Sequence, residues 1–285
     1  MKERRYYSLR TGKNPASTEI DLELFRRLFF NIYSTFLKND YFQETLGYWC
    51  VDADYVPGIL GEDIELYFFR VLRKQNIWPI ESQRENYSED DVFDVIELLY
   101  DLVSKPKEGN YHSYNQCGWH YETFDKQTGQ KEFLEAINSI LEDYMGGFEL
   151  SPKGEILILG GPGLTNIFNA NVPQYEPDNV NKRVECAISK FRRYRSSLEE
   201  RRDAVRDLAD VLEYLRPQLK QVMTKDEGDL FNIANNFAIR HHNERQKRDY
   251  DPNWLSWIFY VYLSTIHLAI RLLDKKSSTE LGIGS

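Results

Sequence analysis

Cysteine is scarce in this chain. The 285 residues contain three, Cys50, Cys117 and Cys186. They stand far apart and are odd in number, which argues against the disulfide framework of a small secreted domain. Basic residues occur near Met1, but no apolar run follows them, so we expect no signal peptide. Both observations predict a protein of the reducing cytoplasm.

Charged side chains are missing from residues 252–270, a segment that contains Trp254 and Trp257. Its length is near that of a membrane span. Its serines, threonine, histidine and tyrosines raise the cost of insertion, so we expect no membrane contact. A helix that is apolar all round is better buried among other helices or between subunits. The segment therefore predicts a homodimer that forms through the C-terminal helices.

A phosphate-binding loop of the common types is also lacking. Gly160, Gly161, Pro162 and Gly163 stand together, and Leu164 and Thr165 follow them. This run has neither the Gly-Lys-Ser/Thr ending of a P-loop nor the spacing of a dinucleotide fingerprint. We interpret it as a turn.

The charge of the chain is unevenly distributed. Hydrophobic residues make up 41% and charged residues 28%, as in soluble globular proteins. Residues 1–175 contain 17 Lys and Arg against 28 Asp and Glu, whereas residues 176–285 contain 19 against 17. The first part should repel nucleic acid, while the second carries a local basic cluster that can attract anions. An Asn- and Pro-rich stretch at residues 166–181 coincides with this shift and predicts a domain boundary.

Hydrophobic periodicity predicts a mainly α-helical protein of two domains. The first, residues 1–170, is expected to be helical with one small β-hairpin at residues 148–159. Residues 109–121 have no period and are expected to form an ordered loop. The second domain, residues 176–285, is expected to be a helical bundle. Helices are expected at residues 19–38, 62–75, 90–103, 131–144, 179–195, 197–220, 226–245 and 253–274.

Residues 235–246 hold the groups best suited to chemistry. Arg240 stands beside His241 and His242, and such a set can contact a phosphate and transfer protons near neutral pH. On an unbroken helix Arg240 and His242 point about 160° apart, so one phosphate could not touch both within one chain. Either the helix ends near Arg240, or His241 is the partner, or two chains share the site. The candidate catalytic residues are Arg240, His241 and His242, with Asn236, Asn243 and Gln246 in support.

The three candidate catalytic residues also have purely structural alternatives. His241 lies at the centre of the apolar face and can be a hydrogen-bonded core histidine. Arg240 and His242 can lie on a solvated face or form ion pairs, such as that of Arg240 with Glu244.

A second basic group spans two expected helix ends. It predicts a track for an RNA backbone, or alternatively a solvated face that is paired with nearby Asp and Glu. The candidate RNA-backbone contacts are Arg192, Arg193, Arg195 and Arg202.

His112, Cys117 and His120 stand close together, and Cys50 could complete a set of four zinc ligands. No second pair of ligands follows nearby, and Cys50 is distant in sequence. A packed aromatic loop is therefore the favoured interpretation. We expect no zinc here, no other metal and no cofactor.

Two parts of the sequence resemble known families. The segments YYSLRTG from Tyr6, YFQETLGY from Tyr41, CVD from Cys50, WPI from Trp78 and CGWHY from Cys117 resemble the AbiJ-type N-terminal domains of abortive-infection proteins. The second half, with NNFAIRHHN from residue 235 and an aromatic last helix, resembles a divergent HEPN helical bundle. Together the resemblances cover nearly the whole chain.

The HEPN resemblance implies a metal-independent ribonuclease that acts as a dimer in antiviral defence or as a toxin. The usual motif places a short spacer between Arg and His, whereas His241 and His242 follow Arg240 directly, and the next histidine is His267. Only Arg240 and the adjacent histidines can be matched to the motif. The AbiJ resemblance implies a sensing or regulatory N-terminal domain. The alternative function is a non-catalytic regulatory module that binds nucleic acid or a nucleotide.

Overall fold

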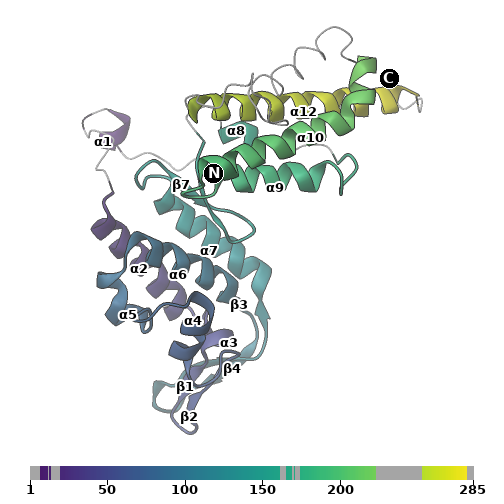
Figure 1. Cartoon of the computed structure of the whole chain (residues 1–285). Helices are drawn as coiled ribbons and strands as arrows, with labels where there is room; N and C mark the ends of the chain where they lie inside the picture. The colour runs from purple at the N-terminus through teal and green to yellow at the C-terminus, as the bar shows by residue number, and fades with distance from the viewer. Residues whose placement is uncertain are drawn as a thin grey trace. The chain divides into compact units, whose positions relative to one another are not determined.

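The computed structural model describes residues 7–11, 13, 20–160, 165–168, 170, 174–222 and 252–280. Helices predominate among these residues, and the strands form small two-stranded sheets (Figure 1). This confirms the prediction of a mainly α protein. The chain divides into two compact units, Met1–Ile156 and Leu157–Ser285.

The longer helices of unit 1 begin at side-chain caps. Asp21 accepts the N–H of Leu24 at 2.8 Å at the start of α2, and Ser88 and Asp91 form a reciprocal capping box at α6. Such caps satisfy amides that have no partner within the helix. Helix α7 begins at Lys126, before the expected residue 131, because Asp125 caps it. The helices are α1 (Tyr7–Arg10), α2 (Leu22–Lys38), α3 (Gln43–Leu46), α4 (Ile64–Leu72), α5 (Ile80–Gln83), α6 (Glu89–Leu102) and α7 (Lys126–Leu141).

Aromatic side chains form the core of unit 1. Phe25 of α2 stacks on Tyr144 with ring centroids 4.2 Å apart and meets Phe93 of α6 edge-on at 6.1 Å. Phe133 of α7 meets Phe36 of α2 edge-on at 5.2 Å. Each such pair contributes about 0.5–1.5 kcal/mol beyond the area it buries. The rings thus hold α2, α6 and α7 together.

The strands pair as hairpins or short ladders, β1 with β2, β3 with β6, β4 with β5 and β7 with β8. The hairpin predicted at residues 148–159 is confirmed as β7 and β8, with Gly154 donating its N–H to the carbonyl of Ser151 at 2.9 Å. The strands are β1 (Tyr48–Cys50), β2 (Asp54–Val56), β3 (Lys105–Pro106), β4 (Gly109–His112), β5 (Gly118–Tyr121), β6 (Phe124–Asp125), β7 (Phe148–Leu150) and β8 (Ile156–Ile158).

The expectation of a loop at residues 109–121 is wrong, because β4 and β5 form an antiparallel hairpin there. Tyr111 lies opposite Trp119, and their rings meet at 5.5 Å. Cross-strand aromatic pairs stabilise a hairpin. Both rings are about half exposed, so the segment lacks the apolar–polar alternation by which a half-buried strand is recognised.

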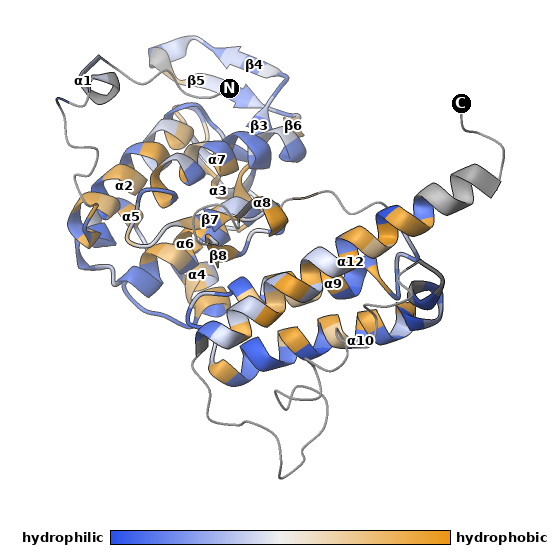
Figure 2. Cartoon of the chain, turned by 90° about the horizontal axis from the view of Figure 1, so that it is seen from above, coloured by the Kyte–Doolittle hydropathy of each residue, from blue (hydrophilic) through white to orange (hydrophobic). Residues whose placement is uncertain are grey.

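Unit 2 is built from packed helices. Helix α10 packs against both α9 and α12 (Figure 1), and Figure 2 shows orange apolar residues alternating with blue polar ones along α10. Helix α10 begins at a capping box, since Glu200 accepts the N–H of Ser197 and donates its own N–H to the Ser197 hydroxyl. The predicted helix at residues 226–245 lies outside the described residues. The described helices are α8 (Thr165–Phe168), α9 (Asn181–Arg192), α10 (Leu198–Val222) and α12 (Pro252–Glu280).

Unit 2 begins at Leu157, before the Asn- and Pro-rich stretch. Phe168, within that stretch, is buried, with its ring centroid 6.1 Å from that of Phe259 and 5.5 Å from that of Tyr260. Leu157 forms an isolated antiparallel bridge with Arg193. The division therefore lies earlier in the chain than the boundary expected at residues 166–181.

Helix α12 is long and apolar enough over Asn253–Asp274 to cross a membrane, judged by length and composition only. Its packing is one-sided, since Phe259 and Leu263 are fully buried in the core while Trp257 and Leu268 are nearly half exposed. A single helix that supplies a core in this way is weak evidence for a membrane span.

Candidate anion-binding site

The predicted catalytic residues lie outside the described residues. This applies to Arg240, His241 and His242 and to the supporting Asn236, Asn243 and Gln246, so their roles stay predictions. The four predicted RNA-backbone arginines are all described, and the fold places them in different surroundings.

Arg192 is not on an open surface track. It is 4% exposed, its Nε donates to the carbonyl of Ile158 at 2.9 Å, and its guanidinium lies 4.7 Å from the ring centroid of Phe168. Burial of a charge is costly unless it is hydrogen-bonded or paired. Arg192 therefore forms part of the wall of a hollow in unit 2.

Arg193 and Arg202 lie outside that wall. Arg193 follows the last residue of α9, and its backbone bridges to Leu157. Arg202 lies 3.4 Å from the Glu199 carboxylate one turn earlier on α10. For Arg202 the structure agrees with the alternative of a solvated, ion-paired face, and such exposed pairs contribute little.

The hollow has a volume of about 230 Å³. Three arginines, Arg192, Arg195 and Arg201, share its wall with aromatic rings, and its described lining residues include no Asp or Glu. The aromatic rings are those of Phe168, Phe191 and Tyr260. Positive charge in a concave, partly apolar site favours an anionic ligand.

The guanidinium of Arg201 is partly buried in the wall of this hollow. Its Nη2 donates to the hydroxyl of Ser256 at 2.8 Å, and its guanidinium lies 4.5 Å from the ring centroid of Phe191. The Nε is buried and has no hydrogen-bond partner among the described residues. Burial lowers the pKa of Arg201 below its ordinary value, yet a guanidinium stays charged at neutral pH. Arg201 therefore carries a fixed positive charge at the wall of the hollow.

Tyr260 responds to the same charges. Burial raises the pKa of its hydroxyl, and the positive charges of Arg201 and Arg192 oppose that rise. A phenol that remains protonated can donate a hydrogen bond to a phosphate oxygen. Arg201 belongs to the basic group that spans the two expected helix ends but is not among the predicted RNA-backbone contacts, because its burial depends on contacts with α9 and α12 that no local pattern reports.

No family model matches this chain, and no curated protein or solved structure is significantly similar to it. The AbiJ and HEPN resemblances therefore stay predictions. The function has to be argued from the site itself.

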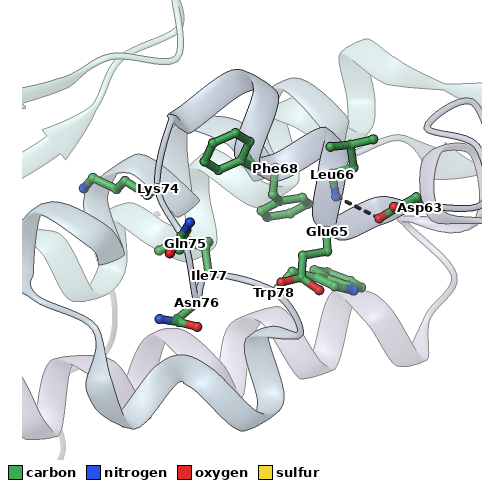
Figure 3. Close-up of a pocket in the computed structure, with 10 residues that line it drawn as sticks. Asp63, Glu65, Leu66, Phe68, Lys74, Gln75, Asn76, Ile77 and Trp78 are labelled. Carbon is green, nitrogen blue, oxygen red and sulfur yellow. Dashed lines mark hydrogen bonds between the residues drawn. The ribbon is translucent and has the colours of Figure 1, made fainter.

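Two charged residues around a larger hollow in unit 1, Asp63 and Lys74, are already engaged (Figure 3). This hollow has a volume of about 400 Å³. Asp63 caps α4 by accepting the N–H of Leu66 at 2.9 Å. Lys74 lies 2.8 Å from Asp91 and 2.6 Å from Asp94. Asp63 and Lys74 therefore serve the fold, and the remaining charged residue of the wall is the acidic Glu65, which does not favour an anion.

Another hollow of unit 1 also contains arginines, Arg26, Arg27 and Arg84, but Glu23 and Glu85 lie beside them in its wall. The acids reduce the positive potential that an anion would meet. The Arg201 hollow is therefore the better anion site of the two.

Unit 1 also brings four possible metal ligands together. The ligand atoms of Cys50, His112, Cys117 and His120 all lie within 4.8 Å of one another. We predicted no zinc because Cys50 is distant in sequence, and that reason does not hold, since the fold closes the distance. The Cys-x-x-His spacing at residues 117–120 was the signal that pointed to this site.

Proposed function

We propose that this protein is an RNA-cleaving effector of the phage-defence or toxin type, and that its helical unit holds the RNA backbone at the Arg201 hollow. The buried guanidinium of Arg201 is the observation that carries the binding step. The volume of about 230 Å³ suits a phosphate group with part of its sugar better than a whole nucleotide.

The cleavage step rests on the sequence of residues 240–242. RNA supplies its own nucleophile, the 2′-OH, so the protein needs a base, an acid and a positive charge but no metal. One of His241 and His242, or the histidine of a second subunit, would remove the 2′-OH proton, and another would protonate the leaving 5′-oxygen. Arg240 would stabilise the charge that develops on the phosphate. The products would be a 2′,3′-cyclic phosphate and a free 5′-hydroxyl.

The aromatic rings of the same hollow support a second candidate, a non-catalytic module that binds a nucleotide or single-stranded nucleic acid. Bases stack on aromatic side chains, and the half-buried ring of Tyr260 is one such side chain in the wall. Incubation of the full chain with total RNA in the presence of a chelator separates the two functions. New 2′,3′-cyclic phosphate ends support the ribonuclease, whereas intact RNA supports the binding module.

Arg201→Met is expected to weaken binding of a single-stranded RNA oligonucleotide by about ten-fold or more, because a hydrogen bond to a charged group contributes about 1.5–3 kcal/mol. The methionine keeps most of the apolar stem of the arginine and removes the guanidinium that lies over Phe191. The slope of log affinity against log salt should also fall by about 0.7, the value for one phosphate contact on a single strand. Fluorescence anisotropy across a salt series measures both quantities.

Arg216→Met is the matched control. Arg216 lies on the same helix, about 22 Å further along it, and pairs with Glu213 at 3.2 Å. This variant should keep wild-type affinity and salt slope. Equal losses in the two variants would mean that only the overall charge of α10 matters, which contradicts a site at Arg201.

We expect the chain to form a homodimer through α12. The exposed side of this helix carries Trp254, Trp257 and Leu268, and large aromatics are enriched at protein interfaces. Sedimentation velocity should show a dimer in the wild type, and Trp257→Gln with Leu268→Gln should shift it toward the monomer. A wild-type monomer at every concentration would refute the dimer.

A further inference from the structure

We propose that Cys50, His112, Cys117 and His120 bind one zinc ion, which joins the β1–β2 hairpin to the β4–β5 hairpin. Two thiolates with two imidazoles form a common ligand set for structural zinc. Four protein ligands leave no position open for water or substrate, so the ion would stabilise unit 1 and take no part in a reaction.

The distances are close to those of a tetrahedral site. Cys50 Sγ lies 3.8 Å from His112 Nδ1, and Cys117 Sγ lies 3.2 Å from His120 Nε2. Zinc bonds of 2.0–2.3 Å place tetrahedral ligand atoms about 3.3–3.8 Å apart. Since all four atoms already lie within 4.8 Å of one another, each needs to move inward by less than about 1 Å.

The turns of the two hairpins supply the ligands. Cys50 is the last residue of β1 and pairs with Asp54. His112 is the last residue of β4 and pairs with Gly118, directly after Cys117. Gly118 has a φ of +105°, which side-chain-bearing residues rarely adopt, and this lets the chain turn so that Cys117 and His120 approach the same point.

Contacts within the protein already bring the two hairpins together. The amide of Gln43, which precedes β1, donates to the carbonyl of Trp119 at 3.0 Å and accepts the N–H of Tyr121 at 2.6 Å, both in β5. The thiol of Cys117 lies 3.7 Å from the carbonyl of Trp49 in β1. The ligands therefore sit on a frame that exists without the metal.

The histidine rings are oriented as zinc ligands usually are. His112 Nε2 lies 3.3 Å from the carboxylate of Asp52, so Nε2–H can donate to Asp52 while Nδ1 is left with its lone pair toward Cys50. A carboxylate behind a ligating histidine fixes its tautomer and increases its basicity. The ring of His120 is held by stacking on Tyr48, with centroids 4.3 Å apart.

A zinc ion at this site would stabilise the two hairpins of unit 1. An isolated two-stranded hairpin is marginally stable in water, and aromatic side chains of these strands, such as Trp49 and Tyr111, are largely exposed. The hairpins thus bury little apolar surface of their own. A zinc ion bound by both would hold their turns together, since the free energy of binding a structural metal contributes directly to folding.

The test is elemental analysis of the full chain, purified after expression in zinc-supplemented medium. Wild type should contain one zinc per chain, and Cys50→Ser and Cys117→Ser should each lose it. Cys186→Ser is the control, because Cys186 is an exposed cysteine of α9 in unit 2, and it should keep the zinc. Replacement with Co²⁺ should give the visible absorption of tetrahedral cobalt with thiolate ligands.

Asp52→Asn examines the carboxylate behind His112. It should bind one zinc at saturation but with about 10–100-fold lower affinity, measured by competition with a chromophoric chelator. An unchanged affinity would show that Asp52 does not support the ligand and would count against this geometry.

Three results would overturn the proposal. These are no zinc in the wild type, zinc retained in both cysteine variants, or a Cys50–Cys117 disulfide in mass spectra of the non-reduced protein. If the cysteine variants do not fold, the zinc released to the chelator is measured for folded wild type and for His112→Gln. The proposal requires that wild type releases one zinc per chain and that His112→Gln releases less than one.

Discussion

Phe259→Ala is expected to reduce the free energy of unfolding of unit 2 by about 3–5 kcal/mol, the usual cost of removing a buried phenylalanine. Phe259 is fully buried and stacks on Phe191 with ring centroids 3.9 Å apart. It also lies near Phe168, so its removal leaves a cavity where α8, α9 and α12 meet. Denaturant unfolding followed by circular dichroism measures the loss.

Ser264→Ala is the control for this prediction. Ser264 is exposed on the same helix, and its hydroxyl donates to the carbonyl of Tyr260. Its removal should change stability by only a few tenths of a kcal/mol. If Phe259→Ala is as mild as Ser264→Ala, α12 does not pack into the core as described.

Arg240→Ala is expected to lower RNA cleavage by about 10²–10³-fold, the typical cost of removing a group that stabilises charge in the transition state. Sequence periodicity places Arg240 beside the apolar face of the predicted helix, not within it, so truncation should open no cavity. The melting temperature should therefore remain unchanged. Cleavage of a labelled RNA and thermal melting, measured on the same preparation, test both statements.

His241 and His242 provide the comparison. His241→Ala should lower both activity and melting temperature, because position 241 faces the predicted core, whereas His242→Ala should lower activity alone. Full cleavage by both Arg240→Ala and His242→Ala would show that the proposed catalytic site is wrong. If the wild type does not cleave RNA and Arg240→Ala unfolds, the non-catalytic binding module replaces the ribonuclease.

The outcomes at Arg240 and at Arg201 can be distinguished. Arg201→Met is expected to weaken RNA binding even if the chain is not an enzyme, since it removes a contact to the ligand. Arg240→Ala is expected to slow cleavage of RNA that is already bound. Loss of binding in Arg201→Met together with no cleavage by the wild type would therefore keep the anion site and remove the ribonuclease.

The sequence by itself determined most of the long helices, and side-chain caps mark the beginnings of several of them. Asp21 at α2, the box of Ser88 with Asp91 at α6, and that of Ser197 with Glu200 at α10 act over three residues. Such interactions, like the periodicity of apolar side chains, join residues within one or two helical turns. They can therefore be predicted from the sequence. The mainly α fold and the hairpin at residues 148–158 followed from local patterns of this kind.

Only the tertiary structure decided which polar side chains meet. Arginines 192, 201 and 202 look alike in the sequence, yet Arg192 is buried, Arg201 lines the hollow and Arg202 pairs with Glu199. Cys50 reaches His112 because two hairpins pack together, across 62 residues of chain. Side chains are buried and brought together here by contacts between segments that are distant in the chain. Neither secondary-structure propensity nor the spacing of residues within one segment predicts such contacts.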